Sequence, residues 1–145
     1  MSNQQQPHFD ILRIYTKNIS LECPNSPQVF MEQGQPEIGI QLSNETQALG
    51  DDQHEVALRI TVTAKVEEKV LFLVEVEQAG IFTLKGFEEE QLSHMRGAFC
   101  PNIIFPYARE IIDNLVRRAG FPPIILAPID FNAVYAERLA QTEAA

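Results

Sequence analysis

The chain has 145 residues, of which 20 are acidic and 11 are basic, so its formal net charge is −9. A chain of this length fits one domain and can bury enough surface to fold without a disulfide or a metal. The negative charge argues against nucleic-acid binding, which needs a basic surface that displaces counterions from phosphates. Residues 1–7 are polar and lack the apolar core of a signal peptide, and no apolar run reaches the roughly 18 residues of a membrane span. We therefore expect a cytoplasmic protein that does not insert into membranes.

The first strand patterns lie in residues 9–42. Residues 9–21 form a long run rich in β-branched and aromatic side chains, which is typical of a strand. Residues 24–36 contain three prolines and a glycine together with apolar side chains, so we expect a crossover loop packed over apolar surface. Ile38, Ile40 and Leu42 alternate with other residues and predict a short second strand, and residues 44–53 are typical of a turn or loop.

The third and fourth strands are predicted as a hairpin. The third strand covers residues 55–66, where an almost complete alternation places one set of apolar side chains on a single face: Val56, Leu58, Ile60, Val62, Ala64 and Val66. A tight turn at residues 67–68 leads to a fourth strand at residues 70–78. That strand is apolar on both faces at residues 71–74, so its second face is covered either by a partner or by an internal loop.

A long amphipathic helix follows the strands. Pro101 and Pro106 predict that residues 97–106 form a rigid elbow and that the helix begins near Pro106. Gly120 and Pro122 end it. Its apolar face has the three- and four-residue spacing of a helix and consists of Ala108, Ile111, Ile112, Leu115, Val116 and Ala119. Strands followed by helices predict an α+β domain with a four-stranded antiparallel sheet and the long helix on one face.

Enzymatic motifs are missing from the sequence. It has no phosphate-binding GxxxxGK[ST], no GxGxxG and no GxSxG, and its three histidines are scattered. Cys100 with His94 is the one plausible pair of nucleophile and base, and the adjacent Pro101 favours a structural role for this segment. Cys23 and Cys100 belong to no metal-binding motif, so we expect two reduced thiols, no metal or other cofactor, and no enzymatic activity.

Six short motifs occur in a fixed order along the chain: RIYTK at residues 13–17, AGIF at 79–82, CPN at 100–102, FPYARE at 105–110, GFP at 120–122 and LAP at 126–128. In content, order and spacing they resemble the SecB family of protein-export chaperones over roughly residues 9–139. The resemblance implies one chaperone domain at residues 9–140, between a flexible N-terminal tail at 1–8 and a short C-terminal tail at 141–145. It also implies a short C-terminal helix.

The resemblance implies an ATP-independent holdase that binds unfolded secretory preproteins and delivers them to the motor ATPase SecA. An apolar groove for clients is then expected between the crossover loop, the second strand and the C-terminal helix, formed by Val29, Phe30, Ile38, Ile40, Leu42, Phe131, Val134, Tyr135 and Leu139. The second-strand residues could equally be ordinary core. Gly34 stands where many members of the family have tryptophan, which reduces the aromatic contact available to clients.

A single groove would bind an unfolded chain weakly, so several grooves must act on one chain, in agreement with the family's homotetramer, a dimer of dimers. Ile111, Ile112, Leu115 and Val116 cannot all be covered by one small sheet and are our candidates for the oligomer interface, although the same stripe could be purely intramolecular.

The helix-free face of the sheet is the expected docking site for SecA. Glu22, Leu73, Glu75 and Glu77 project together there, at positions that match the family's contacts with SecA. Asn18 stands where the family usually has aspartate, so one charge contact is missing. The glutamates could instead form a solvated strand face. The tail after Leu139 is shorter and less acidic than in many members.

Two other functional hypotheses remain open. The same apolar cleft could belong to a small-ligand-binding α+β module or an enzyme. The chain could also be a purely structural subunit of an assembly, whose oligomers ignore unfolded chains.

Overall fold

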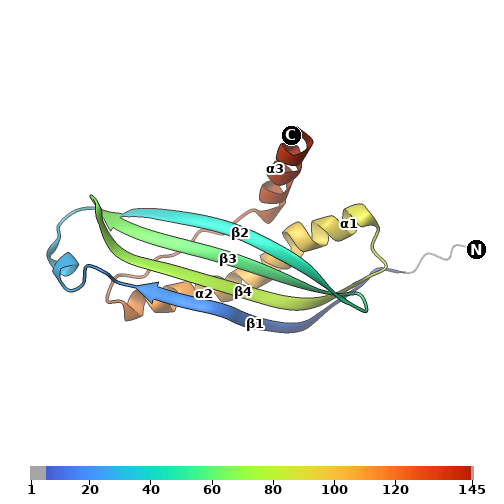
Figure 1. Cartoon of the computed structure of the whole chain (residues 1–145), viewed down its shortest axis with the longest axis horizontal. Helices are drawn as coiled ribbons and strands as arrows, with labels where there is room; N and C mark the ends of the chain where they lie inside the picture. Colours follow the sequence, from blue (N-terminus) through green and yellow to red (C-terminus); the bar gives the residue numbers. More distant parts are fainter. Residues whose placement is uncertain (1–5, 145) are drawn as a thin grey trace, which may run out of the picture.

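The computed structural model describes residues 6–144, although not the side chains of residues 143–144. Four strands, β1 (His8–Glu22), β2 (Glu37–Gly50), β3 (Gln53–Val66) and β4 (Lys69–Lys85), form one antiparallel sheet in the order β1-β4-β3-β2. Behind this sheet lie α1 (Glu89–His94), the π-helical turn η2 (Met95–Phe99) and α2 (Cys100–Arg118), which follow one another without a break (Figure 1). The short 3-10 helix η1 (Gln28–Met31) lies in the crossover loop, and α3 (Phe131–Ala144) ends the chain. The predicted α+β fold is confirmed.

Hairpin geometry corrects the prediction of a loop at residues 44–53. β2 continues to Gly50 and pairs with β3 along its whole length, and only Asp51 and Asp52 form the turn. Both aspartates have positive φ angles, 54° and 62°, which a two-residue turn requires and which aspartate tolerates better than most residues. The polar composition of residues 44–50 reflects a strand exposed on both faces. The second predicted turn, at residues 67–68, is confirmed.

The fourth strand differs from the prediction in two ways. It extends to Lys85, so the AGIF motif lies inside the strand. A bulge at Leu71 explains its apolar run, because Ala64 pairs with Phe72 and Lys65 with Val70, which leaves Leu71 without a partner position. Of residues 71–74, Leu73 alone remains as the half-buried apolar side chain, while the other three are buried.

The long helix begins well before Pro106, which corrects the expected elbow. Backbone N–H of Glu88 donates to Gln91 Oε1 at 3.2 Å at the start of α1, and helix continues from there to Arg118. Pro101 lies in the first turn of α2 just after the π-helical turn, where a wider backbone accommodates the ring. Pro106 lies inside α2; it disfavours helix by about 3 kcal/mol. Burial of neighbouring Ile104 and Phe105 at roughly 1.5–3 kcal/mol each outweighs that cost.

The core lies between the sheet and α2. α2 packs mainly on β4 and also on β3, and its side chains at four-residue spacing are fully buried: Ile104, Ala108, Ile112 and Val116. The alternating face of β3 from Val56 to Val66 is buried against it, as predicted. Gly120 ends the helix with a φ of +92°, which confirms the predicted helix end.

The predicted tails are only partly described. Residues 1–5 and 145 lie outside the described residues. Of the expected N-terminal tail, His8 belongs to β1, and of the expected C-terminal tail, residues 141–144 belong to α3. Among the helices within residues 6–144, none is long and apolar enough to cross a membrane.

Candidate functional site

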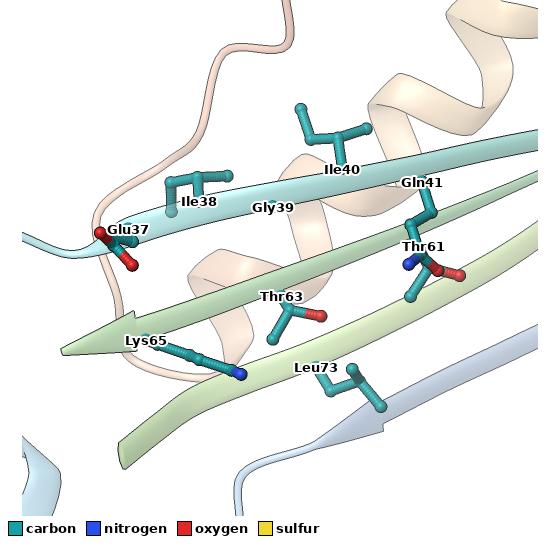
Figure 2. Close-up of a pocket in the computed structure, with 9 residues that line it drawn as sticks. All are labelled: Glu37, Ile38, Gly39, Ile40, Gln41, Thr61, Thr63, Lys65 and Leu73. Atoms are coloured by element: carbon teal, nitrogen blue, oxygen red, sulfur yellow. The ribbon is translucent and has the colours of Figure 1, made fainter. Parts of the chain in front are cut away.

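The helix side of β2 carries apolar side chains that the fold leaves uncovered. Ile38, Ile40 and Leu42 pair with Ala64, Val62 and Ile60 and therefore point to the same side of the sheet as the core. Because α2 lies over β4 and β3, it leaves this edge open: Ile38 is 43% exposed, Ile40 is 50% exposed and Leu42 is half-buried. In Figure 2 the side chains of Ile38 and Ile40 point away from those of Thr63 and Leu73.

The crossover loop contributes one exposed aromatic side chain. Its residue Val29 is 4% exposed and belongs to the core, which corrects its assignment to the groove. Phe30 is 47% exposed and stacks on Phe121 with 5.1 Å between ring centroids. Asn25 Nδ2 donates to the Val70 carbonyl oxygen at 2.9 Å, so the loop is fixed against the β3–β4 end of the sheet.

α3 contributes a second apolar edge. Phe131 is 4% exposed and packs against Phe105, so it anchors the helix in the core and cannot line a groove, which corrects that prediction. Val134 and Tyr135 are half-buried, and Leu139 is 42% exposed. The Tyr135 hydroxyl donates to Ser93 Oγ at 2.8 Å, so this part of α3 packs against α1 and η2.

The helix-free face of the sheet carries the second predicted surface. Asn18 pairs with Glu77 and Glu22 with Leu73, and Glu75 lies between them on the same face of β4, so the structure brings all five residues together. A shallow hollow of about 780 Å³ adjoins Leu73 and continues across Thr63 to Gly39 (Figure 2). This part of the face therefore combines one apolar side chain, Leu73, with the three glutamates Glu22, Glu75 and Glu77.

Not all the acidic residues of this face are equally free. Glu77 forms an ion pair with Arg59 at 3.2 Å, whereas Glu75 accepts a hydrogen bond from the Thr61 hydroxyl at 3.3 Å. Glu22 is exposed. The ion pair at Glu77 leaves Glu75 and Glu22 as the carboxylates best able to meet a cationic partner.

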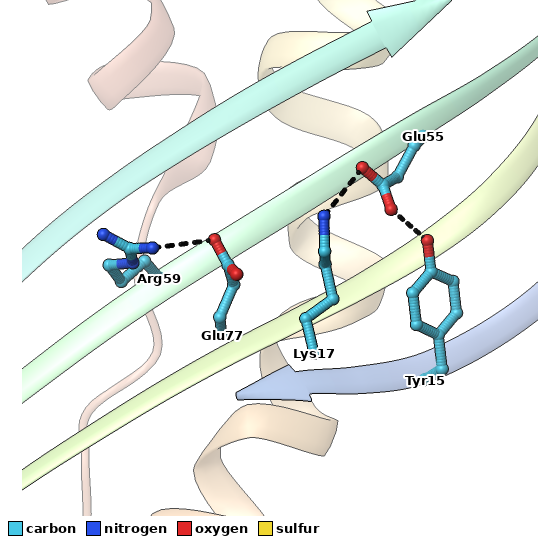
Figure 3. Close-up of polar contacts among 5 residues, drawn as sticks. All are labelled: Tyr15, Lys17, Glu55, Arg59 and Glu77. Atoms are coloured by element: carbon cyan, nitrogen blue, oxygen red, sulfur yellow. Dashed lines mark hydrogen bonds and ion pairs between the residues drawn. The ribbon is translucent and has the colours of Figure 1, made fainter. Parts of the chain in front are cut away.

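Sequence reasoning missed a polar cluster at the other end of the same face. The Tyr15 hydroxyl donates to Glu55, and Lys17 Nζ lies 3.2 Å from the second Glu55 oxygen (Figure 3). Burial, followed by the hydrogen bond to Glu55 and its negative charge, raises the pKa of Tyr15 to about 12. These residues lie on β1 and β3, strands that are separated by β4 and about forty positions apart, so no local pattern could have revealed the cluster.

The predicted interface stripe on α2 divides into two halves. Ile112 and Val116 are 0% exposed within the single chain, so the sheet covers them completely and they have no surface left for a partner, which corrects their assignment. Ile111 and Leu115 are half-buried and remain candidates for an interface. The stripe is split because α2 presents the row of Ile104, Ala108, Ile112 and Val116 to the sheet.

The one pair considered for catalysis is not assembled. Cys100 is fully buried, and this burial raises the pKa of its thiol to about 12, so the reactive thiolate is not formed near neutral pH. His94 Nε2 instead lies 2.7 Å from Asn132 Oδ1. Among the described side chains, those of residues 6–142, no group of three or more His, Cys, Asp or Glu is placed to hold a metal ion.

Comparison with known proteins gives a consistent family match. The family described as "Preprotein translocase subunit SecB" matches residues 2–142. A relative from Chromobacterium violaceum named "Protein-export protein SecB" is 56% identical over 143 residues, which are 97% of this chain and 95% of the relative. One of the same name from Marinobacter nauticus is 50% identical over 141 residues, which are 97% of this chain and 86% of that relative.

A solved structure shares the fold. It is a SecB-like chaperone from Mycobacterium tuberculosis in complex with a peptide from an antitoxin, and it is 16% identical with a TM-score of 0.68. The match covers 83% of this chain and 90% of that chain.

Proposed function

This chain belongs to the SecB family, and on that premise we propose that it is an ATP-independent export chaperone, which binds unfolded secretory preproteins, prevents their folding and aggregation, and delivers them to the SecA motor ATPase. The relatives named protein-export protein match nearly the whole chain, so the similarity covers the complete fold and not only a part of it. The structure of a SecB-like chaperone with a bound peptide gives further support to polypeptide binding.

One observation carries the proposal: the apolar helix side of β2 remains open. Ile38 and Ile40 are each about half exposed although their neighbours on β3 are fully buried. A folded protein keeps its own apolar side chains inside, whereas an unfolded chain can lay them along this edge. The client groove that we propose consists of the exposed and half-buried members of the predicted set, which are Phe30, Ile38, Ile40, Leu42, Val134, Tyr135 and Leu139.

The energetics require more than one groove. Completing the burial of four or five half-exposed side chains supplies roughly 1 kcal/mol each, and ordering a disordered segment removes about 2–5 kcal/mol. Several grooves acting on one client raise the affinity by about a hundredfold or more without new contacts. We therefore propose a homotetramer, a dimer of dimers, in which the half-buried Ile111 and Leu115 of α2 contribute to a subunit interface.

Size-exclusion chromatography with light scattering tests this function. The protein is run alone, then with a polypeptide that is held permanently unfolded, then with the folded form of that polypeptide. We expect a tetramer that elutes together with the unfolded chain and ignores the folded one. A monomer, or an oligomer that is indifferent to unfolded chains, would contradict the proposal.

We propose the helix-free sheet face as the docking surface for SecA. Leu73 supplies an apolar contact, and Glu22 and Glu75 supply charges that guide encounter, since rim charges affect mainly the association rate. Asn18 and the ion-paired Glu77 complete the same face.

The Glu75→Lys substitution tests the docking surface. We expect it to weaken SecA association while client capture is unchanged. Glu68→Lys, at the β3–β4 turn, makes the same charge change away from the surface and serves as control. Equal loss of SecA association and client capture in Glu75→Lys would refute the separation of the two surfaces.

A further inference from the structure

A small hollow of about 240 Å³ lies where α3 meets β2 and the segment of α1 and η2. Arg96 of η2 and Arg138 of α3 line it from two elements, together with the hydroxyl-bearing Ser93 and Thr46 and the ring of Tyr135. We call it the arginine hollow. In Figure 1, α3 stands beside the sheet on the side of β2, and the hydrogen bond from Arg138 to Asn44 Oδ1 links the two elements.

The two arginines are unusual in so acidic a chain. Ion pairs among the described side chains, those of residues 6–142, involve four cations, Lys17, Arg59, Lys69 and Arg117, and include neither Arg96 nor Arg138. The partner of Arg138 is the neutral oxygen of Asn44, which does not compensate its charge. Arg96 is half-buried and therefore less solvated, so a bound anion would stabilise its charge, whereas Arg138 is exposed and adds a second, solvated guanidinium.

Arg96 is the more buried of the two. Its side chain is half-buried, and after burial its positive charge is the next cause that lowers the pKa of the nearby His54. The Arg96 guanidinium therefore lies close enough to His54 for its charge to act on that ring. His54 Nδ1 is itself buried without a hydrogen-bond partner among the described residues. An imidazole is neutral or positively charged, so His54 offers no counter-charge to Arg96.

Two residues of the proposed client groove, Tyr135 and Leu139, also line the hollow. Leu139 is 42% exposed, and Tyr135 packs so closely on Gly97 that a Cβ there would lie 2.6 Å from the ring. The hydrogen bond from the Tyr135 hydroxyl to Ser93 Oγ keeps the ring beside the two arginines. Both Tyr135 and Leu139 are residues of the proposed groove, so a bound segment there would meet the guanidinium groups.

We propose that the arginine hollow binds the carboxylate of an Asp or Glu side chain within an otherwise apolar segment of a bound client. The inference rests on the proposed chaperone function, because the occupant is the unfolded polypeptide in the groove. Guanidinium groups form strong, charge-assisted hydrogen bonds with carboxylates. The chain as a whole has a net charge of −9, which repels acidic segments, so the two arginines would let the hollow accept clients that the rest of the surface disfavours.

Two capped synthetic peptides test the inference. They share the same leucine and phenylalanine residues and differ only in a single central Glu or Gln, and acetylated and amidated ends leave the Glu side chain as the only carboxylate. Fluorescence anisotropy measures the affinity of each for the full chain. We expect the Glu peptide to bind about 1.5- to fivefold more tightly, the range for one charge pair at a solvent-exposed site.

Variants assign this preference to the two arginines. Arg96→Gln with Arg138→Gln should remove the preference for Glu, whereas Arg96→Lys with Arg138→Lys should retain most of it, because the charge remains. Arg118→Gln removes a charge at the far end of α2, outside the hollow, and should leave the preference unchanged.

The other possible outcomes show whether carboxylate binding in the hollow fails or whether the chaperone function itself fails. Equal affinity of the wild-type protein for both peptides overturns the inference while the chaperone function stands. If neither peptide binds and unfolded proteins are also ignored, the proposed function itself fails. If inorganic phosphate raises the melting temperature while the peptides bind equally, the hollow is a site for small anions, and the inference is again overturned.

Discussion

The Ile40→Ala substitution should weaken client binding more than it weakens the fold. Full burial of an isoleucine side chain is worth roughly 1.5–3 kcal/mol. Ile40 is 50% exposed in the chain, so a client can bury only this exposed half. The substitution should therefore cost about 0.7–1.5 kcal/mol of binding free energy, which is a three- to twelvefold loss of affinity per groove.

A short labelled apolar peptide that occupies one groove measures this factor by fluorescence anisotropy. A long unfolded protein that occupies several grooves should show a larger loss, because the factors multiply. Leu49→Ala is the matched control, since Leu49 lies on the same strand and is 45% exposed but is outside the groove. Unchanged peptide affinity in Ile40→Ala, or an equal loss in Leu49→Ala, would refute the assignment of β2 to the groove.

Three further substitutions test the packing. Ile112→Ala should lower the free energy of unfolding by about 2–5 kcal/mol in urea titrations, because Ile112 is fully buried; a change below 1 kcal/mol would contradict its place in the core. Gly97→Ala should accelerate amide exchange in α3, since its Cβ would lie 2.6 Å from the Tyr135 ring; unchanged exchange would show that the ring moves freely. Burial and then the charge of Arg96 lower the pKa of His54 in the folded chain, so below about pH 6.5 the unfolded chain binds more protons at this residue than the folded chain does. The melting temperature should therefore fall as the pH drops below about 6.5. An equal fall in the His54→Gln variant would contradict this.

Local patterns were sufficient for much of the fold. The alternation of β3 predicted its buried face residue by residue, and the turn at residues 67–68 and the helix end at Gly120 were confirmed. These features depend on side-chain period and on the backbone angles that glycine permits, both of which are local properties. The family was also recognisable, because its motifs are short and contiguous.

Predictions failed where a neighbour in space outweighed the local preference. Pro106 is tolerated within α2 because the residues around it are buried against the sheet. Residues 44–50 form a strand because β3 pairs with them throughout, despite their polar composition. A bulge at Leu71, which a sequence does not reveal, changed the faces of the apolar run in β4.

By itself, the sequence determined the elements, their order, the acidic character and the family, since each follows from composition, periodicity or contiguous motifs. The tertiary structure alone decided which apolar residues remain available. Val29, Phe131, Ile112 and Val116 entered the core, while Ile38 and Ile40 stayed open to solvent. The reason is that α2 covers two of the four strands, β4 and β3, and the position of one element over another depends on contacts between distant residues that no local pattern contains.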